Sequence, residues 1–121
     1  MIRVSIGFLF SEDKQRVALL CREDEGFAWS GVGGHVDPGE TFYNAMVREF
    51  EEEAGVCILD WNLFHSGIYY GLDIQFFRAF SPKIDQVTTM ESDKVAIKFV
   101  SEIYMLKTME NIPFLIQEAT R

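Results

Sequence analysis

The sequence is poor in cysteine, proline, histidine and positive charge. Its 121 residues include 2 cysteines, 3 prolines, 2 histidines and 11 basic residues. Cys21 and Cys57 belong to no CxxC motif or Cys/His cluster, so neither a disulfide framework nor a zinc site is indicated. We expect both cysteines to be reduced, which is in keeping with a cytoplasmic protein.

The shortage of basic residues excludes a class of partners. Nineteen acidic residues give a formal net charge of −8, whereas nonspecific binding to nucleic acid or to an anionic membrane relies on Lys/Arg patches. The early apolar run, Ile6 to Phe10, is too short for a signal peptide or a membrane span. We therefore expect no nucleic acid and no membrane partner, and any phosphate-bearing ligand must bring its own cations.

Apolar residues are plentiful. Ile, Val, Leu and Phe make up about a third of the chain, well above the level at which disorder is expected. The length is that of one compact domain, so we expect residues 1–121 to form a single domain. Exposed edge strands could pair two copies, and a homodimer is left open.

Apolar periodicity predicts strands on both sides of a central helix. Alternation over 4–10 and an apolar stretch over 17–21 predict a β-hairpin. The glycine density of 23–39 predicts a shaped loop with a short extended piece at 32–36. The uninterrupted stretch 41–54 predicts a helix, with Thr41 as N-cap and Gly55 as its end. Residues 56–63 and 64–70 are expected to form one long or two short strands, and further strands are expected at 74–80 and 95–100. A polar loop is expected at 81–92 and a closing helix around 112–116.

The predicted helix carries an unusual concentration of acid. Glu49, Glu52 and Glu53 stand at positions i, i+3 and i+4, and so project from one face, while Glu51 points away. Without a partner this arrangement is repulsive, and a bound divalent cation would reverse the sign. Oxygen-only ligands select hard cations such as Mg²⁺. One alternative is a solvated acidic helix face without a ligand, and another is an interaction domain whose acidic helix docks a basic partner.

The segment 34–56 as a whole resembles a known signature. It runs GHVDPGETFYNAMVREFEEEAGV, which is similar to the G-x5-E-x7-R-E-U-x-E-E-x-G-U box of the Nudix (MutT-like) hydrolase family, where U is a bulky aliphatic residue. Two departures occur: Phe50 replaces an aliphatic residue, and Val32 stands where a proline often precedes the Gly-Gly pair. Both concern local packing rather than the metal ligands.

The resemblance implies a fold and a set of site residues. The fold is of the α/β class, an α/β/α sandwich with a mixed β-sheet and a loop-helix-loop catalytic motif. Glu40 and Arg48 resemble the pair that ties the loop to the helix. Carried over position by position, the metal-binding groups are the carboxylates of Glu49, Glu52 and Glu53 and the carbonyl of Gly33.

The resemblance also implies a reaction. It is the Mg²⁺- or Mn²⁺-dependent hydrolysis of a nucleoside diphosphate linked to another moiety. Because the chain is short, we expect a small substrate, and the leading one is a (d)NTP that is cleaved to monophosphate and pyrophosphate. ADP-ribose, nucleotide sugars and dinucleoside polyphosphates remain open, as does a domain that binds nucleotide without turnover. The general base is Glu49 or Glu52, or one of Glu91 and Asp93 ahead of the strand at 95–100.

The sequence indicates less clearly which residues recognise the base. Aromatic rings suit stacking on a nucleobase, although each is also a candidate for the core. His35 lies in the glycine-rich loop, where a lone histidine is more often a polar spacer than a catalyst. The aromatic candidates are Phe27, Trp29, Tyr69, Tyr70 and Phe76.

Overall fold

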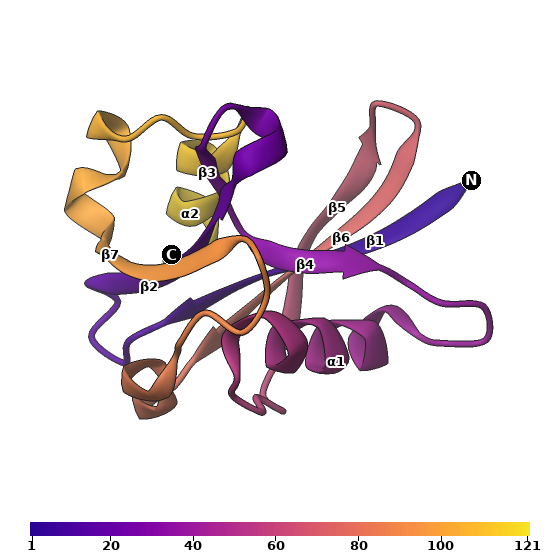
Figure 1. Cartoon of the computed structure of the whole chain (residues 1–121), viewed down its shortest axis with the longest axis horizontal. Coiled ribbons are helices and arrows are strands. Elements are labelled where there is room, and N and C mark those ends of the chain that lie inside the picture. The colour runs from indigo at the N-terminus through magenta and orange to yellow at the C-terminus, as the bar shows by residue number, and fades with distance from the viewer.

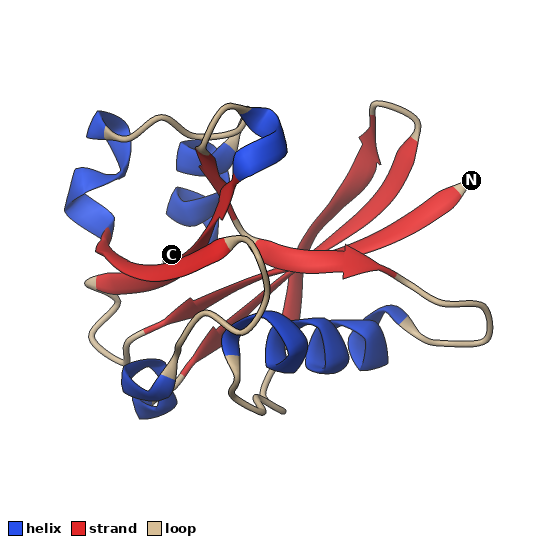
Figure 2. Cartoon of the chain, viewed as in Figure 1, coloured by secondary structure: helices blue, strands red, loops and turns tan.

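The computed structural model describes all 121 residues, and its centre is a mixed β-sheet (Figures 1 and 2). The strands are β1 (Ile2–Phe10), β2 (Arg16–Arg22), β3 (Ala28–Ser30), β4 (Val32–His35), β5 (Asn62–Tyr69), β6 (Leu72–Phe80) and β7 (Lys94–Phe99). The α-helices are α1 (Phe42–Ala54) and α2 (Ile112–Ala119). Short 3-10 helices are η1 (Glu23–Glu25), η2 (Pro82–Gln86) and η3 (Val100–Met105). No helix is long and apolar enough to cross a bilayer.

The sheet forks along one edge of β1. Its main path runs β3-β2-β1-β6-β5, with β7 paired to β2 and β4 paired to β1. Along that edge, β1 pairs with β4 over residues 4–7 and with β2 at residues 9 and 10. The opposite edge of β1 pairs in parallel with β6 along its whole length. Because β2 and β4 separate from each other, a space opens between them.

Local sequence explains where α1 begins and ends. The Thr41 hydroxyl accepts a hydrogen bond from the Asn44 backbone N–H at 3.0 Å, and Gly55 ends the helix in the left-handed conformation with φ of 76°. The expected helix and both of its caps are confirmed. Its buried stripe faces the core and consists of Ala45, Met46, Phe50 and Ala54.

Both faces of the sheet are covered. One apolar cluster joins α1 to the sheet through residues such as Met46, Phe50 and Phe77. The other joins α2 to the opposite face through residues such as Phe8 and Leu115. Figure 1 shows α1 along one side of the sheet and α2 on the other. The expected α/β/α arrangement is confirmed.

Two segments of the structure differ from the elements expected for them. The strand expected over 56–63 is wrong: residues 56–61 are irregular, and β5 begins at Asn62. Val56, Ile58 and Trp61 are buried in the core although their backbone joins no ladder, and this burial accounts for their apolar character. The polar segment 81–92 also contains a 3-10 turn, η2.

The close approach of β4 to β1 gives a first prediction. A Cβ added at Gly33 would lie 1.9 Å from the Ser5 carbonyl oxygen, whereas one at Gly34 would meet the end of the Glu49 side chain. We expect Gly33→Ala to lower the free energy of unfolding by about 1–3 kcal/mol through overpacking. Urea unfolding followed by circular dichroism measures it, with Gly34→Ala as the control expected to cost less. Equal losses would contradict this account of β4.

Candidate active site

Arg48 joins the loop after β4 to α1. Its Nε and Nη2 donate to the two carboxylate oxygens of Glu40 at 2.8 and 2.9 Å, and Nη2 also donates to the His35 carbonyl at 3.0 Å. Glu40 in turn accepts the Asp37 backbone N–H at 3.0 Å. A planar guanidinium suits this paired geometry. The structure thus brings together the two residues expected to tie the loop to the helix.

These bonds change the acidity of Glu40. The hydrogen bonds from Arg48, and then that from the Asp37 N–H, lower the pKa of Glu40 to about 2. The same contacts raise the pKa of Arg48 above its usual range. The pair is therefore ionised throughout the physiological pH range.

Glu49 and Glu52 also turn toward Arg48. The guanidinium Nη1 lies 2.9 Å from Glu49 Oε1 and 3.3 Å from Glu52 Oε2. The Glu49 side chain is 14% exposed and that of Glu52 is 48% exposed. Burial raises the pKa of Glu49, and Arg48 opposes that rise. The Glu49 carboxylate lies against the backbone of Gly34, where a Cβ would come within 2.6 Å of both its oxygens.

Glu53 differs from its neighbours because no cation balances it. Its Oε2 is buried and has no hydrogen-bond partner. Burial, followed by the charges of Glu91, Glu49, Asp93 and Glu52, raises the pKa of Glu53 to about 7. A buried carboxylate oxygen without a partner is costly, so its retention calls for an explanation.

The three box glutamates lie on one helix but do not converge on a point. No three acidic, histidine or cysteine side chains stand close enough together to enclose a metal ion in this conformation. The reason is visible in the contacts, since Arg48 draws Glu49 and Glu52 toward itself while Glu53 faces the other way into a cavity.

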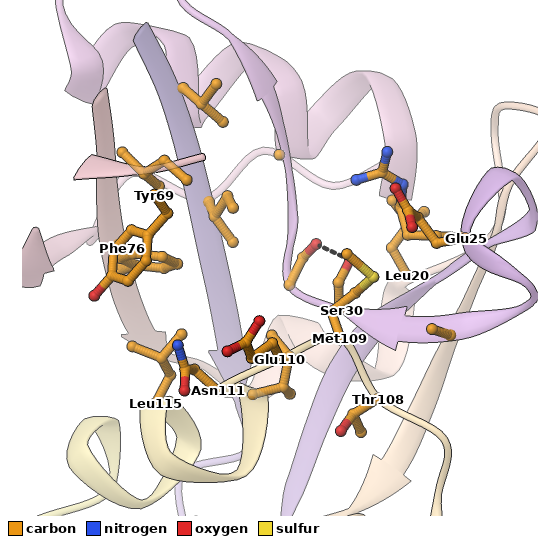
Figure 3. A pocket seen from close by; sticks show the side chains of 18 of the residues that line it. Leu20, Glu25, Ser30, Tyr69, Phe76, Thr108, Met109, Glu110, Asn111 and Leu115 are labelled. Carbon is orange, nitrogen blue, oxygen red and sulfur yellow. Dashed lines mark hydrogen bonds between the residues drawn. The ribbon is translucent and has the colours of Figure 1, made fainter. Parts of the chain in front are cut away.

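That cavity lies in the fork of the sheet and has a volume of about 860 Å³ (Figure 3). Gly33, Gly34 and Glu53 line one part of it. Another part is lined by β1, β5, β6, α2 and the segment that precedes α2. Its lysine and arginine residues are Arg22 and Lys107. The volume lies within the usual range for small-molecule sites.

The aromatic candidates divide into two groups. Tyr69, Tyr70 and Phe76 line the cavity, whereas the structure corrects the placement of Phe27 and Trp29, which do not. Alternation along β3 explains Trp29, because the neighbouring residues 28 and 30 face the cavity. Its ring packs under the Lys98 ammonium at 4.7 Å instead. The Phe27 side chain is mainly exposed to solvent.

The acidic candidates ahead of β7 also divide. Asp93 lines the cavity and accepts a hydrogen bond from the Glu23 backbone N–H at 3.4 Å. Glu91 does not line it, although its charge is close enough to act on Glu53. His35 lines the cavity as well.

Sequence reasoning missed the segment 107–111. It has no regular periodicity, yet its backbone joins β3 through the hydrogen bonds from Trp29 N to Lys107 O and from Met109 N to Trp29 O, both 2.9 Å. Every residue from Lys107 to Asn111 lines the cavity. No pattern in the sequence marks this segment, since its position depends on a pairing with a strand about 80 residues earlier.

The Glu40–Arg48 pair predicts a pH-dependent stability. The pKa of Glu40 is depressed in the folded protein, so its contribution is present above the ordinary pKa of about 4.3 and is lost as the pH falls toward 2. We expect Glu40→Gln to cost about 1–2 kcal/mol at pH 7 and progressively less below pH 4. Urea unfolding at pH 7, 5 and 3 measures this, with exposed Glu12→Gln as control. A cost that stays constant over this range would contradict the assignment.

Comparison with known proteins agrees with this architecture. The model of the NUDIX domain matches residues 1–102. A solved structure of MutT, from work on the enzymes of Aliivibrio salmonicida and Vibrio cholerae, superposes with a TM-score of 0.83 at 27% identity, covering 98% of this chain and 97% of that one. The Escherichia coli dihydroneopterin triphosphate pyrophosphohydrolase shares the fold, with a TM-score of 0.74 at 19% identity over 96% of this chain and 92% of that one.

A similarity in sequence is more local. Residues of this chain are 35% identical over 51 positions to the dihydroneopterin triphosphate diphosphatase of Escherichia coli K12, a match that spans 42% of this chain and 34% of that protein. The family model, in contrast, covers most of the chain. On that evidence the chain belongs to the Nudix family of hydrolases.

Proposed function

We propose that the chain is a divalent-metal-dependent pyrophosphohydrolase that cleaves a nucleoside diphosphate linked to another moiety, with nucleoside triphosphates as the leading substrates. The observation that carries this proposal is Glu53. Its carboxylate has a buried oxygen without a partner, faces a cavity of suitable volume for a nucleotide, and feels four other acids. A cation would remove that penalty.

The donor set fits Mg²⁺ or Mn²⁺. Hard cations prefer carboxylate and carbonyl oxygens, and no cysteine lines this part of the cavity. The absence of a side chain at Gly34 leaves room for the Glu49 carboxylate against the backbone of β4. In this proposal the residues that hold the metal are Glu49, Glu52, Glu53 and, through its carbonyl, Gly33.

The metal, when bound, supplies neutralisation of the diphosphate and a lower pKa for an attacking water. The residues of the chain orient the site and supply positive charge. Arg48 fixes the orientation of Glu49 and of the loop through Glu40. Lys107 brings positive charge to the cavity for the phosphate groups, whereas the Arg22 guanidinium is paired with Asp24.

The proton acceptor must reach the water that attacks phosphorus. Glu49 is covered and engaged by Arg48, whereas Glu52 is half exposed. Outside the helix, Asp93 lines the cavity and Glu91 does not. Glu52 is also paired with Arg48 and does not line the cavity, so geometry favours Asp93 among the four candidates for the general base.

The similarities support the class of substrate. The structure with the TM-score of 0.83 is a MutT, and the sequence relative is a dihydroneopterin triphosphate diphosphatase. The name of the sequence relative specifies a triphosphate as the substrate of that protein. A triphosphate is therefore favoured here over dinucleotides and nucleotide sugars.

The reaction is tested by incubating a panel of nucleotides with the protein and Mg²⁺ and separating the products. We expect a triphosphate to yield monophosphate and pyrophosphate, and a chelator to abolish turnover. Glu52→Gln and Glu53→Gln should each lower kcat by about 100-fold or more, whereas Glu51→Gln, on the far side of α1, should change it little. Release of orthophosphate with diphosphate would count against the reaction, and nucleotide binding without turnover would indicate a non-catalytic domain.

The metal site has a readout that does not require turnover. At pH 8 in a chelator, Glu53→Gln removes a buried unpaired charge, so we expect its Tm to exceed that of the parent by roughly 3–6 °C. Millimolar Mg²⁺ should raise the Tm of the parent and leave that of the variant nearly unchanged. Differential scanning fluorimetry measures both. A parent protein that is insensitive to Mg²⁺ and Mn²⁺ would argue against a metal at Glu53.

A further inference from the structure

The strand β5 forms an outer edge of the sheet with unpaired backbone groups. It is the last strand on the main path of the sheet, and it pairs only with β6. No backbone group of residues 62–70 forms a hydrogen bond with a turn or a loop. A row of N–H and C=O groups therefore faces solvent along this edge, and such a row is a template for pairing with another strand.

Other edges of the sheet are protected in ways that proteins commonly use. The segment 107–111 covers the outer edge of β3 through backbone hydrogen bonds to Trp29. The strand β7 carries Lys94 and Lys98, and lysines on an edge strand oppose pairing with a second strand. In contrast, β5 lies within an uncharged stretch, 61–71, that contains no Asp, Glu, Lys, Arg or Pro. Nothing in the sequence of β5 therefore discourages a partner strand.

The turn after β5 determines which of its backbone groups point outward. Tyr70 and Gly71 both have positive φ, of 53° and 76°, as in the type I′ turn of a two-residue hairpin. The Tyr70 hydroxyl also donates to Glu110 Oε2, which ties the turn to the segment ahead of α2. The pair that flanks such a turn, Tyr69 and Leu72, exchanges hydrogen bonds within the hairpin, and bonded and non-bonded pairs alternate from there.

Ser66 and Ile68 present both of their backbone groups to the open edge. The ladder with β6 is regular over residues 65–69, since its register shift lies before them, so the alternation holds throughout this part of β5. Ser66 and Ile68 lie on either side of Gly67. A second copy of β5 can therefore pair with the first in antiparallel register about a two-fold axis at Gly67. In that register Ser66 of each copy exchanges hydrogen bonds with Ile68 of the other.

Apolar side chains flank the open edge on both faces of the sheet. Leu63 and Ile68 lie on the face that α1 covers, yet they are 53% and 66% exposed. On the other face, the Phe114 ring centroid of α2 lies 6.2 Å from that of His65, and Phe114 is 50% exposed. Association along this edge would remove apolar surface from water, which favours it.

A second copy of this chain fits the edge better than a segment of another protein. The axis at Gly67 places the two Ile68 side chains diagonal to each other, about 7–8 Å apart and within reach. The two strands approach most closely at Gly67, at about 4.5 Å between Cα atoms, where no side chain stands between them. A partner attracted by the net charge of −8 would bring basic groups, but this edge offers no acid to them. The same residues serve both copies, as a two-fold interface requires.

We propose that two copies of this chain associate along β5, in antiparallel register about Gly67, and form one sheet that runs through both. The inference goes beyond the proposed function and does not depend on it. Few residues of each copy take part, so the interface belongs to the small class and the dimer dissociates on dilution. The cavity of each copy is complete without the other.

Sedimentation equilibrium of the full chain over about 10 µM to 1 mM measures the association. We expect the average mass to rise with concentration from the 13.9 kDa of one chain toward twice that value. Because each copy carries a charge of −8, added NaCl screens the repulsion between them and should tighten the dimer. A monomer at every concentration and salt would overturn the proposal.

Hydrogen exchange followed by NMR locates the contact. The amides of Ser66 and Ile68 face the open edge, whereas those of Gly67 and Tyr69 are bonded to β6 in monomer and dimer alike. We expect Ser66 and Ile68 to exchange at least about 3-fold more slowly in a concentrated sample than in a dilute one, while Gly67 and Tyr69 stay the same. Exchange at Ser66 and Ile68 that is independent of concentration would contradict pairing at this edge.

Variants test the register against a matched control. Ile68→Lys brings two ammonium groups together across the axis, and Ser66→Pro removes an N–H that β6 does not use. Each should raise the dimer Kd at least about 10-fold. Ile2→Lys makes the same change at an exposed residue of β1, two strands inside the edge, and should alter the Kd less than about 2-fold.

The variants are read only where folding is intact. Circular dichroism and urea unfolding on dilute samples check each fold, and Ile68→Lys, at an exposed side chain, decides the question even if Ser66→Pro unfolds. A dimer as tight in Ile68→Lys as in the parent would place the contact elsewhere and overturn the proposal. Equal weakening by Ile2→Lys would do the same, because it would show a general effect of charge.

Discussion

The guanidinium of Arg48 holds the candidate site together. It contacts carboxylates from both the loop and the helix, with the shortest distances to Glu40 and Glu49. These acids would otherwise repel one another, and an acidic helix end is disfavoured by the helix dipole as well. By balancing them, Arg48 permits a concentration of negative charge on α1 that would otherwise destabilise the fold. The planar fork matters, because a lysine could not satisfy two carboxylates and a carbonyl at fixed angles.

The fork in the sheet determines where the cavity lies relative to the acidic residues of α1. Because β1 gives the same edge first to β4 and then to β2, the space between them opens beside the glycine backbone of β4. Glu53 reaches this space from α1, and the segment ahead of α2 closes it from the other side. The cavity is therefore enclosed by elements of this one sheet and the helices packed on it.

The box and the helix were predictable because their determinants are local. The caps at Thr41 and Gly55, the apolar stripe of α1 and the spacing of the glutamates all lie within one helix and its flanks. The irregular path of residues 56–61 was not predictable, because their apolar side chains fill the core while their backbone joins no ladder. Trp29 was misplaced because composition names an aromatic residue but not the face of the strand on which it lies. The segment 107–111 depends on pairing with β3, a long-range contact that no local pattern encodes.

The two ends of the cavity differ in how firmly the fold holds them. The end that holds Glu53 is built from a helix and a strand whose positions are set by dense backbone hydrogen bonding and by Arg48, so its geometry tolerates little change. The end that holds Glu110 and Asn111 lies on an irregular segment attached to the fold by a few backbone bonds and the Tyr70 contact. Substitution there alters the lining of the cavity at small cost to the core. A fold of this kind can therefore keep the backbone around Glu53 unchanged while the residues of the segment ahead of α2 vary.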